Sequence, residues 1–226
     1  CQLSSLARQR ILSGELVSRA SLEAEQLERN GYILLDFKDS QYPQLLREIV
    51  EPPLVLYAYG QIDLLNQAGV AVVGSRRPTA YGRLLADKLA DELAACGLVV
   101  TSGLARGIDT LAHQGALRSG KTLAVLGSGL DRIYPKENRF LAEKIAARGL
   151  VVSEFPLGSE PLSFHFPLRN RVLSGLSLAC LVVEAGLKSG ALITAGLALD
   201  QGREVMAVPG PVTSDLSRGT HFLIKH

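Results

Sequence analysis

The sequence of 226 residues has few cysteines, few aromatic residues and no long hydrophobic run. The uncharged stretch Val172–Val183 is far shorter than the roughly 20 apolar residues that a membrane-spanning helix requires. The three cysteines, Cys1, Cys96 and Cys180, lack metal-ligand spacing, and the last two lie within apolar segments. We therefore expect buried thiols in a cytoplasmic protein, with no membrane partner and no metal site.

Sequence motifs of several common enzyme classes are not recognisable. There is no Gly-x-Ser-x-Gly elbow and no Ser/His/Asp set with a familiar spacing. The pair Gly127 and Gly129 is not completed by a third glycine at the spacing that dinucleotide-binding loops use. We therefore predict a protein that is not an enzyme and that has no catalytic residue, no nucleotide-triphosphatase site and no cofactor.

Charge is nearly balanced over the whole chain, with 24 basic and 22 acidic residues and a net charge of +2. This balance neither favours nor excludes a nucleic-acid partner, because only clustering of charge on one face creates a strong local potential. The positions of the basic residues in the fold therefore matter more than their number.

Residues 70–82 carry the clearest pattern. Four apolar residues, Val70–Val73, precede Gly74-Ser75-Arg76-Arg77-Pro78, and a helical pattern begins near Tyr81. An uninterrupted apolar run indicates a strand that is covered on both faces, as in a parallel sheet. The amides at the start of the following helix and the two arginines would suit an anion such as phosphate. A tight turn with solvated arginines is the alternative.

Strands and helices alternate from residue 70 onward, a pattern typical of parallel strands joined by right-handed crossovers. We predict an α/β fold: an extended Rossmann-like, doubly wound, mostly parallel sheet in three layers, α/β/α, enlarged by strands near residues 32–35 and 54–57. A helical pattern at the N-terminus, interrupted at Ser13-Gly14, indicates the remnant of a small helical domain. The six main strands are predicted at 70–73, 98–101, 123–126, 150–153, 179–183 and 205–208, with helices at 81–95, 109–118, 136–147, 168–176 and 191–201.

Each loop after the first five of these strands contains glycine, a basic residue or both. Because ligands of such sheets bind at the carboxyl ends of the strands, these loops should converge on one site. Their combined charge would focus positive potential on one face. This favours a site for a chain of phosphates over a site for one small nucleotide, and a scaffold that binds only protein is a third possibility.

Two of these loops allow competing interpretations. Ser189, which precedes Gly190, would either cap the helix that follows or leave its amides free for an anion, with Thr194 adding a hydroxyl. Asp109 should cap its own helix, and contact with a base or sugar is the alternative. Glu184 should hold Arg169 or Arg171 in place, and a catalytic carboxylate is the alternative.

Aromatic residues occur next to basic ones at Phe164-His165-Phe166 and Arg169. Rings beside guanidinium groups are typical of sites for single-stranded nucleic acid. We expect one of the two phenylalanines to lie in the core.

Seven short motifs follow one another along the chain: Pro52-Pro53-Leu54-Val55-Leu56-Tyr57, Gly74-Ser75-Arg76, Ser102 to Asp109, Phe166 to Arg171, Glu184-Ala185 with Ser189-Gly190, Ala207 to Gly210, and Gly219 to Ile224. In this order they resemble the DNA-processing protein family DprA, also called Smf. The resemblance runs from about Tyr32 to the last residue.

The resemblance implies an extended Rossmann domain that binds single-stranded DNA without sequence preference. It implies a homodimer that protects incoming DNA and loads the recombinase RecA during natural transformation. In the family, the arginine of the Gly-Ser-Arg turn contacts phosphate, which is Arg76 here. The lysine after Tyr-Pro, here Lys136, lines the same pocket, and Phe166 would contact a base. Many relatives have lysine where this sequence has Ser163, which removes one phosphate contact.

The resemblance and the loop pattern together predict two sets of residues and a domain plan. Residues 1–30 would be a remnant of an N-terminal SAM-like domain, residues 31–226 the DNA-binding Rossmann domain, and a C-terminal winged-helix-like domain common in relatives would be absent. The predicted dimer contacts are His221, Leu223 and Ile224. The predicted DNA-binding residues are Gly74, Ser75, Arg76, Arg77, Gly103, Arg106, Gly107, Lys136, Phe166, Arg169, Asn170, Arg171, Ser189, Gly190 and Thr194.

An enzyme provides the alternative. Residues 184–194 also resemble the nucleotide-binding end of the lysine-decarboxylase-like phosphoribohydrolases, which carry a Pro-Gly-Gly-x-Gly-Thr run. Here residues 185–190 read Ala-Gly-Leu-Lys-Ser-Gly, so that signature is not present.

Overall fold

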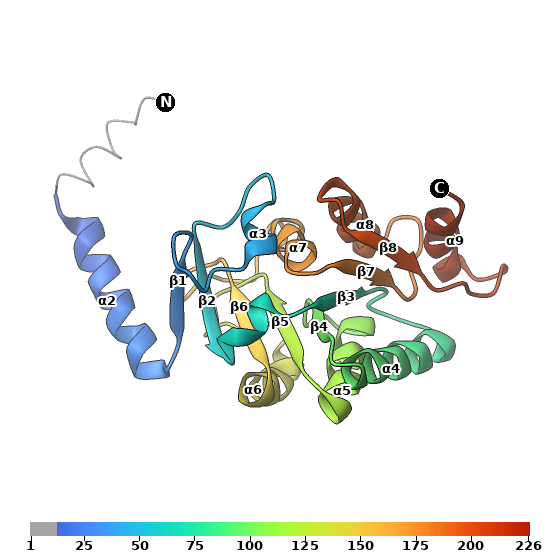
Figure 1. The fold of residues 1–226 in the computed structure, drawn as a ribbon, viewed down its shortest axis with the longest axis horizontal. Helices are drawn as coiled ribbons and strands as arrows, with labels where there is room; N and C mark the ends of the chain where they lie inside the picture. Colours follow the sequence, from blue (N-terminus) through green and yellow to red (C-terminus); the bar gives the residue numbers. More distant parts are fainter. Residues whose placement is uncertain (1–12) are drawn as a thin grey trace.

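The computed structural model of the chain describes residues 13–226 and has an eight-stranded sheet at its centre (Figure 1). The strand order is β1-β2-β6-β5-β4-β3-β7-β8; β2 runs antiparallel to both of its neighbours, and all other pairs are parallel. The predicted doubly wound, mostly parallel sheet is therefore confirmed. The strands are β1 (Ile33–Asp36), β2 (Val55–Gly60), β3 (Gly69–Val73), β4 (Val99–Ser102), β5 (Thr122–Leu126), β6 (Leu150–Ser153), β7 (Ala179–Val182) and β8 (Glu204–Ala207).

Helices cover both faces of the sheet, while one helix lies beyond each end of it (Figure 1). One face carries α4 (Ala80–Ala95), α5 (Ile108–Ser119) and α6 (Arg139–Arg148), and the other carries α3 (Gln44–Arg47), α7 (His165–Gly175) and α8 (Gly190–Asp200). The end helices are α2 (Glu15–Asn30) beside β1 and α9 (Arg218–Lys225) beside β8. Three short 3-10 turns, η1 (Ile62–Asn66), η2 (Lys136–Asn138) and η3 (Asp215–Ser217), complete the described elements.

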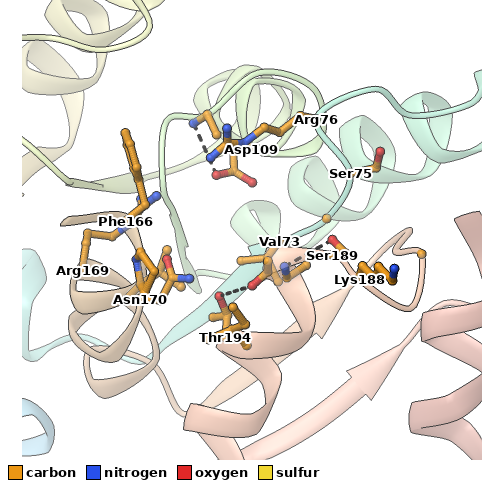
Figure 2. Close-up of a pocket in the computed structure, with 18 of the residues that line it drawn as sticks. Val73, Ser75, Arg76, Asp109, Phe166, Arg169, Asn170, Lys188, Ser189 and Thr194 are labelled. Atoms are coloured by element: carbon orange, nitrogen blue, oxygen red, sulfur yellow. Dashed lines mark hydrogen bonds between the residues drawn. The ribbon is translucent and has the colours of Figure 1, made fainter. Parts of the chain in front are cut away.

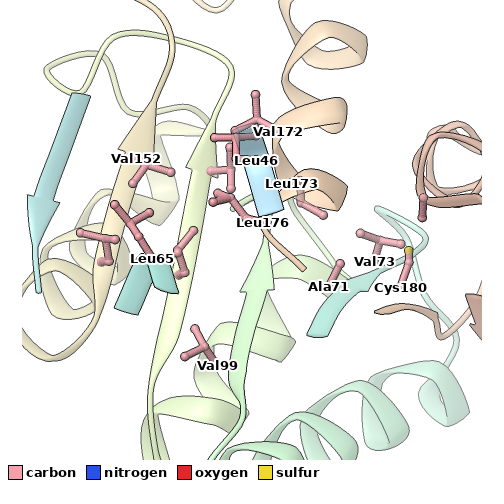
Figure 3. Packing of buried hydrophobic residues seen from close by; sticks show 14 of the residues in the cluster. Leu46, Leu65, Ala71, Val73, Val99, Val152, Val172, Leu173, Leu176 and Cys180 are labelled. Carbon is pink, nitrogen blue, oxygen red and sulfur yellow. The ribbon is translucent and has the colours of Figure 1, made fainter. Parts of the chain in front are cut away.

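Strand β3 shows why a central strand can be an uninterrupted apolar run. Ala71 and Val73 join the cluster under α7 and α8, which Figure 3 shows around Leu173 and Cys180. The residues that alternate with them, Val70 and Val72, pack against α4 and α5 on the opposite face. Every residue of β3 is therefore buried, which explains why this strand is apolar throughout.

Strand order fixes the place where a ligand would bind. From β3 the chain builds β4, β5 and β6 outward on one side, and then returns to place β7 and β8 on the other. The strand order therefore reverses between β3 and β7. In doubly wound sheets, a crevice opens at this point beyond the carboxyl ends of the strands.

Several predictions about the elements need correction. Cys180 is fully buried as expected, but Cys96 lies exposed after the end of α4. The helix predicted at 136–147 begins with the 3-10 turn η2, and α9 was not predicted. The expected N-terminal helix is present as α2, in which only Leu27 is buried. The part of that prediction on residues 1–12, including Cys1, lies outside the described residues.

The prediction of no nucleotide-triphosphatase site did not take account of one short match to the phosphate-loop pattern, which lies in the wrong structural context. Residues 115–122 read Gly-Ala-Leu-Arg-Ser-Gly-Lys-Thr, which has the spacing of such a loop. A phosphate loop connects a strand to the helix that follows it, whereas this segment runs from the end of α5 into β5. Its Lys121 donates a hydrogen bond to the side-chain oxygen of Gln61 at 2.9 Å.

No helix within residues 13–226 combines the length and apolar character needed to cross a membrane.

Candidate functional site

A cleft of about 790 Å³ opens at the point where the strand order reverses. All five loops named above contribute to it, as expected for the carboxyl edge of a parallel sheet. The α7 side chains Phe166, Arg169 and Asn170 form one wall, and Lys188, Ser189 and Thr194 lie across from them (Figure 2). The loop residues that line the cleft include Gly74, Ser75, Arg76, Ala105, Asp109, Tyr134, Pro161, Ser163, Gly186, Lys188 and Ser189.

The turn that carries Arg76 is fixed by backbone contacts. The Ser75 amide donates to the Glu184 carbonyl at 2.7 Å, and the Ser75 carbonyl accepts from the Ile108 amide at 3.1 Å. Gly107 has φ +77°, and a Cβ at this position would overlap the Ser75 carbonyl. Glycine is therefore required at 107, since it permits both the positive φ and the close approach. The Arg76 side chain projects from a rigid turn and is exposed.

Glu184 differs from its prediction. It is 3% exposed, and its carboxylate accepts from the Thr79 amide at 2.8 Å and the Thr79 hydroxyl at 2.6 Å. Thr79 is the N-cap of α4 and in turn accepts from the Gly82 amide. The expectation that Glu184 holds Arg169 or Arg171 is therefore wrong. Glu184 instead connects the segment after β3 with the end of β7, at the point where the strand order reverses.

Arg76, Phe166 and Tyr134 form an aromatic and cationic edge of the cleft. The Arg76 guanidinium lies 5.6 Å from the centre of the Phe166 ring, a distance suitable for a cation–π interaction. Tyr134 is 5.7 Å from Phe166 between ring centres. Phe166 is half-buried and Phe164 is exposed, so the prediction that one phenylalanine lies in the core is wrong. The ring of Phe166 remains in part accessible from the cleft.

Arg169 and Asp109 lie at the floor of the cleft, 5% and 7% exposed. Arg169 donates from Nη1 to the Val125 carbonyl at 2.7 Å. Burial raises the pKa of Asp109, while the nearby positive charge of Arg169 and backbone amides oppose that rise. The guanidinium of Arg169 is thus engaged inside the protein, unlike that of Arg76.

The buried side chains of Arg169 and Asp109 pack against the loop after β4 and hold it in place. The Asp109 carboxylate accepts from the Ala105 amide at 3.3 Å and does not cap α5, whose N-cap is Gly107, so that prediction is wrong. A Cβ on Gly103 would overlap the Arg169 guanidinium. The intervening Leu104 is fully buried at φ +58°, which is a strained conformation for leucine.

On the facing wall, Ser189 acts as the N-cap of α8. Its hydroxyl accepts from the Ala191 amide at 3.3 Å, and Thr194 donates to the Gly190 carbonyl at 3.5 Å. Lys188 is exposed, and no ion pair engages it within residues 13–226. It was absent from the predicted site, although its position in the basic loop after β7 could have indicated it.

Four predicted basic residues lie outside the cleft. Lys136 lines a neighbouring cleft of about 770 Å³, which shares Tyr134 and Pro161 with the first, so it does not line the same pocket as Arg76. Arg106 forms an ion pair with Glu137. The remaining two are Arg171, 18% exposed and paired with Glu154, and Arg77, which is exposed.

The predicted glycines have different positions. Gly74 and Gly190 line the cleft. Gly103 lines a small recess between Arg76 and Phe166 that also contains Arg106.

The three predicted dimer contacts do not share one face. Nε2 of His221 lies 3.0 Å from the Gly210 carbonyl oxygen, and Leu223 packs partly against the core. Ile224 is 53% exposed, as is its neighbour Phe222 at 51%. The exposed apolar surface of α9 is therefore formed by Phe222 and Ile224.

Within residues 13–226, no group of three or more His, Cys, Asp or Glu side chains could hold a metal ion.

Residues 33–226 match the sequence model of a family described as DNA recombination-mediator protein A. The chain is 44% identical over 211 residues to protein Smf of Escherichia coli (strain K12), covering 92% of this chain and 56% of that protein. It is 47% identical over 188 residues to DNA processing protein DprA of Streptococcus pneumoniae (strain ATCC BAA-255 / R6), covering 83% and 66%. The chain thus spans little more than half to about two thirds of these relatives.

Two solved structures are similar over most of the chain. The X-ray structure of DNA processing protein A from Streptococcus pneumoniae gives a TM-score of 0.83 at 45% identity, covering 86% of this chain and 69% of that one. A structure that concerns the single-stranded DNA binding mode of DNA processing protein A from Helicobacter pylori gives 0.78 at 34% identity, covering 86% and 87%.

Proposed function

The chain belongs to the DNA recombination-mediator protein A family, and we propose that its cleft binds single-stranded DNA without sequence preference. One observation carries the proposal: an exposed guanidinium, Arg76, lies next to an accessible ring, Phe166, at the mouth of a cleft where five loops meet. The cation suits phosphate, and the ring suits the face of an unpaired base. The Helicobacter pylori relative, whose structure concerns single-stranded DNA binding, supports the proposal.

A sequence-independent mode follows from the chemistry of the groups. Arg76 and Lys188 would meet phosphates, which are the same in every sequence. The Phe166 ring offers a stacking surface, and every base has a face that can stack on it. Arg169 and Asp109 would act indirectly, because they hold the loop after β4 under the bound strand.

We extend the proposal to the partners that the family resemblance implies. The protein would form a homodimer through α9, protect incoming DNA and load the recombinase RecA in the cytoplasm during natural transformation. It would do so as a binding protein without a catalytic step.

The alternative, a nucleotide-binding phosphoribohydrolase, is disfavoured. The segment between β7 and α8 lacks the glycine-rich signature of those enzymes. In addition, Ser189 uses its hydroxyl to cap α8, so one group of that segment is already occupied.

Two assays on the same preparation separate these functions. The first measures binding to oligo-dT and to a duplex of matched length across a salt series. We expect preferential binding to the single strand and a steep loss of affinity with salt. The second measures release of adenine from AMP, for which we expect no activity. Base release without oligo-dT binding would contradict the proposed function.

A further inference from the structure

A second concave surface lies between α5 and α6, the two helices that Figure 1 shows on the face of the sheet opposite α7. It has a volume of about 470 Å³ and shares no lining residue with the cleft in which we propose that DNA binds. We call it the α5–α6 groove. Its lining residues are Gln114, Leu117, Arg118, Glu137, Asn138, Phe140, Leu141, Lys144, Ala147 and Arg148.

The groove has an apolar floor and an exposed aromatic rim. Leu117 and Leu141 are nearly buried at its base, whereas Phe140 is 67% exposed. A phenylalanine this exposed contributes little to the stability of the fold through burial. Exposed apolar residues that gather in a groove are typical of interaction sites. The floor would accept one apolar side chain of a partner.

One side of the groove carries uncompensated positive charge. The Lys144 ammonium lies 4.5 Å from the centre of the Phe140 ring. Within residues 13–226, neither Lys144 nor Arg148 takes part in an ion pair. The other charged residues of the groove are already paired: Arg118 with Asp87 and Asp91, and Glu137 with Arg106.

We infer that the α5–α6 groove binds an acidic peptide segment that inserts an apolar side chain beside Phe140. Lys144 and Arg148 are one helical turn apart on α6, and their Cβ atoms are therefore about 5–6 Å apart. Carboxylates two residues apart in an extended peptide project from the same face at a spacing of about 7 Å. Two acidic residues with apolar neighbours would therefore meet both cations and the apolar floor.

A single nucleic-acid strand fits the groove less well. A continuous chain of phosphates would meet only two unpaired cations here, because Arg118 is bound by Asp87 and Asp91, and Glu137 is paired with Arg106. A short peptide with two acidic residues needs no more than these two cations. The charge pattern therefore favours an acidic peptide over DNA.

The test selects ligands from a random 12-residue peptide library displayed on phage, against the full chain. Clones are then measured by fluorescence anisotropy on wild type, on Phe140→Ala and on the double variant Lys144→Glu/Arg148→Glu. The matched control is Arg19→Glu/Lys38→Glu, which makes the same charge change on exposed residues outside the groove. Oligo-dT binding is recorded for every variant.

We expect selected clones to combine two or more acidic residues with an apolar residue. Their affinity should fall by about tenfold or more on the groove double variant, since two attractive pairs become repulsive. Phe140→Ala should also weaken them, while the control pair and oligo-dT binding should not change. Selection of no clone, or of clones that bind the groove variants like wild type, overturns the inference. If the groove double variant also lost oligo-dT binding, the groove would be part of the DNA-binding surface, and the inference of a peptide site would be overturned.

Discussion

The guanidinium of Arg76 lies 5.6 Å from the centre of the Phe166 ring, and this contact connects the turn after β3 with the first turn of α7. Arg76 comes from the turn after β3, and Phe166 comes from the start of α7. A phosphate bound to Arg76 would have its attached base within reach of Phe166. The two side chains should nevertheless contribute to binding in different ways.

Replacement of Arg76 by alanine should weaken binding to single strands and to duplex alike, because both contain phosphates. The loss of one phosphate contact should reduce the slope of log affinity against log salt by about 0.7. Anisotropy titrations of oligo-dT at several salt concentrations measure this slope. Lys38→Ala, which removes an exposed charge outside the cleft, is the control and should leave the slope unchanged. An unaltered slope for Arg76→Ala would remove Arg76 from the site.

Replacement of Phe166 by alanine should act mainly on single strands. Stacking of a base on a ring contributes about 1–3 kcal/mol, and a duplex hides its base faces. The preference for oligo-dT over duplex should therefore decrease together with the affinity. Phe164→Ala is the matched control, because Phe164 is a neighbouring exposed ring that does not line the cleft. If Phe166→Ala folds normally and keeps the wild-type preference, strand selection must come from other residues.

Gly103→Ala tests whether the packing of Arg169 against the loop after β4 is required for stability and binding. The added Cβ would overlap the Arg169 guanidinium, which is fixed by Val125 and cannot easily retreat. We expect a loss of about 1–3 kcal/mol of unfolding free energy and weaker oligo-dT binding. Gly196→Ala is the control, since no atom lies within 4 Å of its added Cβ and alanine favours helix. Urea unfolding of wild type and of both variants gives the comparison. If Gly103→Ala were as stable as wild type, the loop would accommodate the added Cβ without loss.

The sequence allowed the sheet to be predicted because short, mainly apolar segments alternate with helical patterns. Strand β3, for example, is an unbroken apolar run that is followed by Gly74. The convergence of five loops followed from topology alone. The partners of buried charges could not be predicted, because they depend on which loops approach one another in space. Glu184 bonds to Thr79, and Arg171 pairs with Glu154, yet no periodicity in the sequence indicates either contact.

Ile224→Glu tests the proposed dimer. Ile224 is exposed, so a charge there should not unfold the protein but should repel its copy in a self-complementary interface. Sedimentation velocity should then show monomers. Leu223→Glu should behave differently and lower the unfolding free energy, because Leu223 packs partly against the core. A dimer that survives Ile224→Glu would place the interface elsewhere.

His113 should make the stability of the protein depend on pH. Burial, with a smaller contribution from the charge of Arg169, lowers the pKa of this fully buried imidazole to about 3. Its Nδ1 lies 2.7 Å from the Thr122 hydroxyl, which itself donates to the Val100 carbonyl. Nδ1 therefore carries the proton and donates to Thr122, whereas Nε2 is buried without a partner. Protonation of Nε2 would place an uncompensated charge in the core.

The sign of the effect follows from the two pKa values. In the unfolded chain, histidine titrates near pH 6.5, so below that pH the unfolded state binds a proton that the folded state does not accept until about pH 3. Stability is therefore complete above about pH 6.5 and falls as the pH decreases toward 3. Between pH 7 and pH 5 the loss from this one residue should be about 2 kcal/mol. Urea unfolding at both values should show a smaller decrease for His113→Gln than for wild type, whereas His226→Gln, which changes an exposed histidine, should retain the full decrease. The same pH dependence in His113→Gln and wild type would mean that other groups cause it.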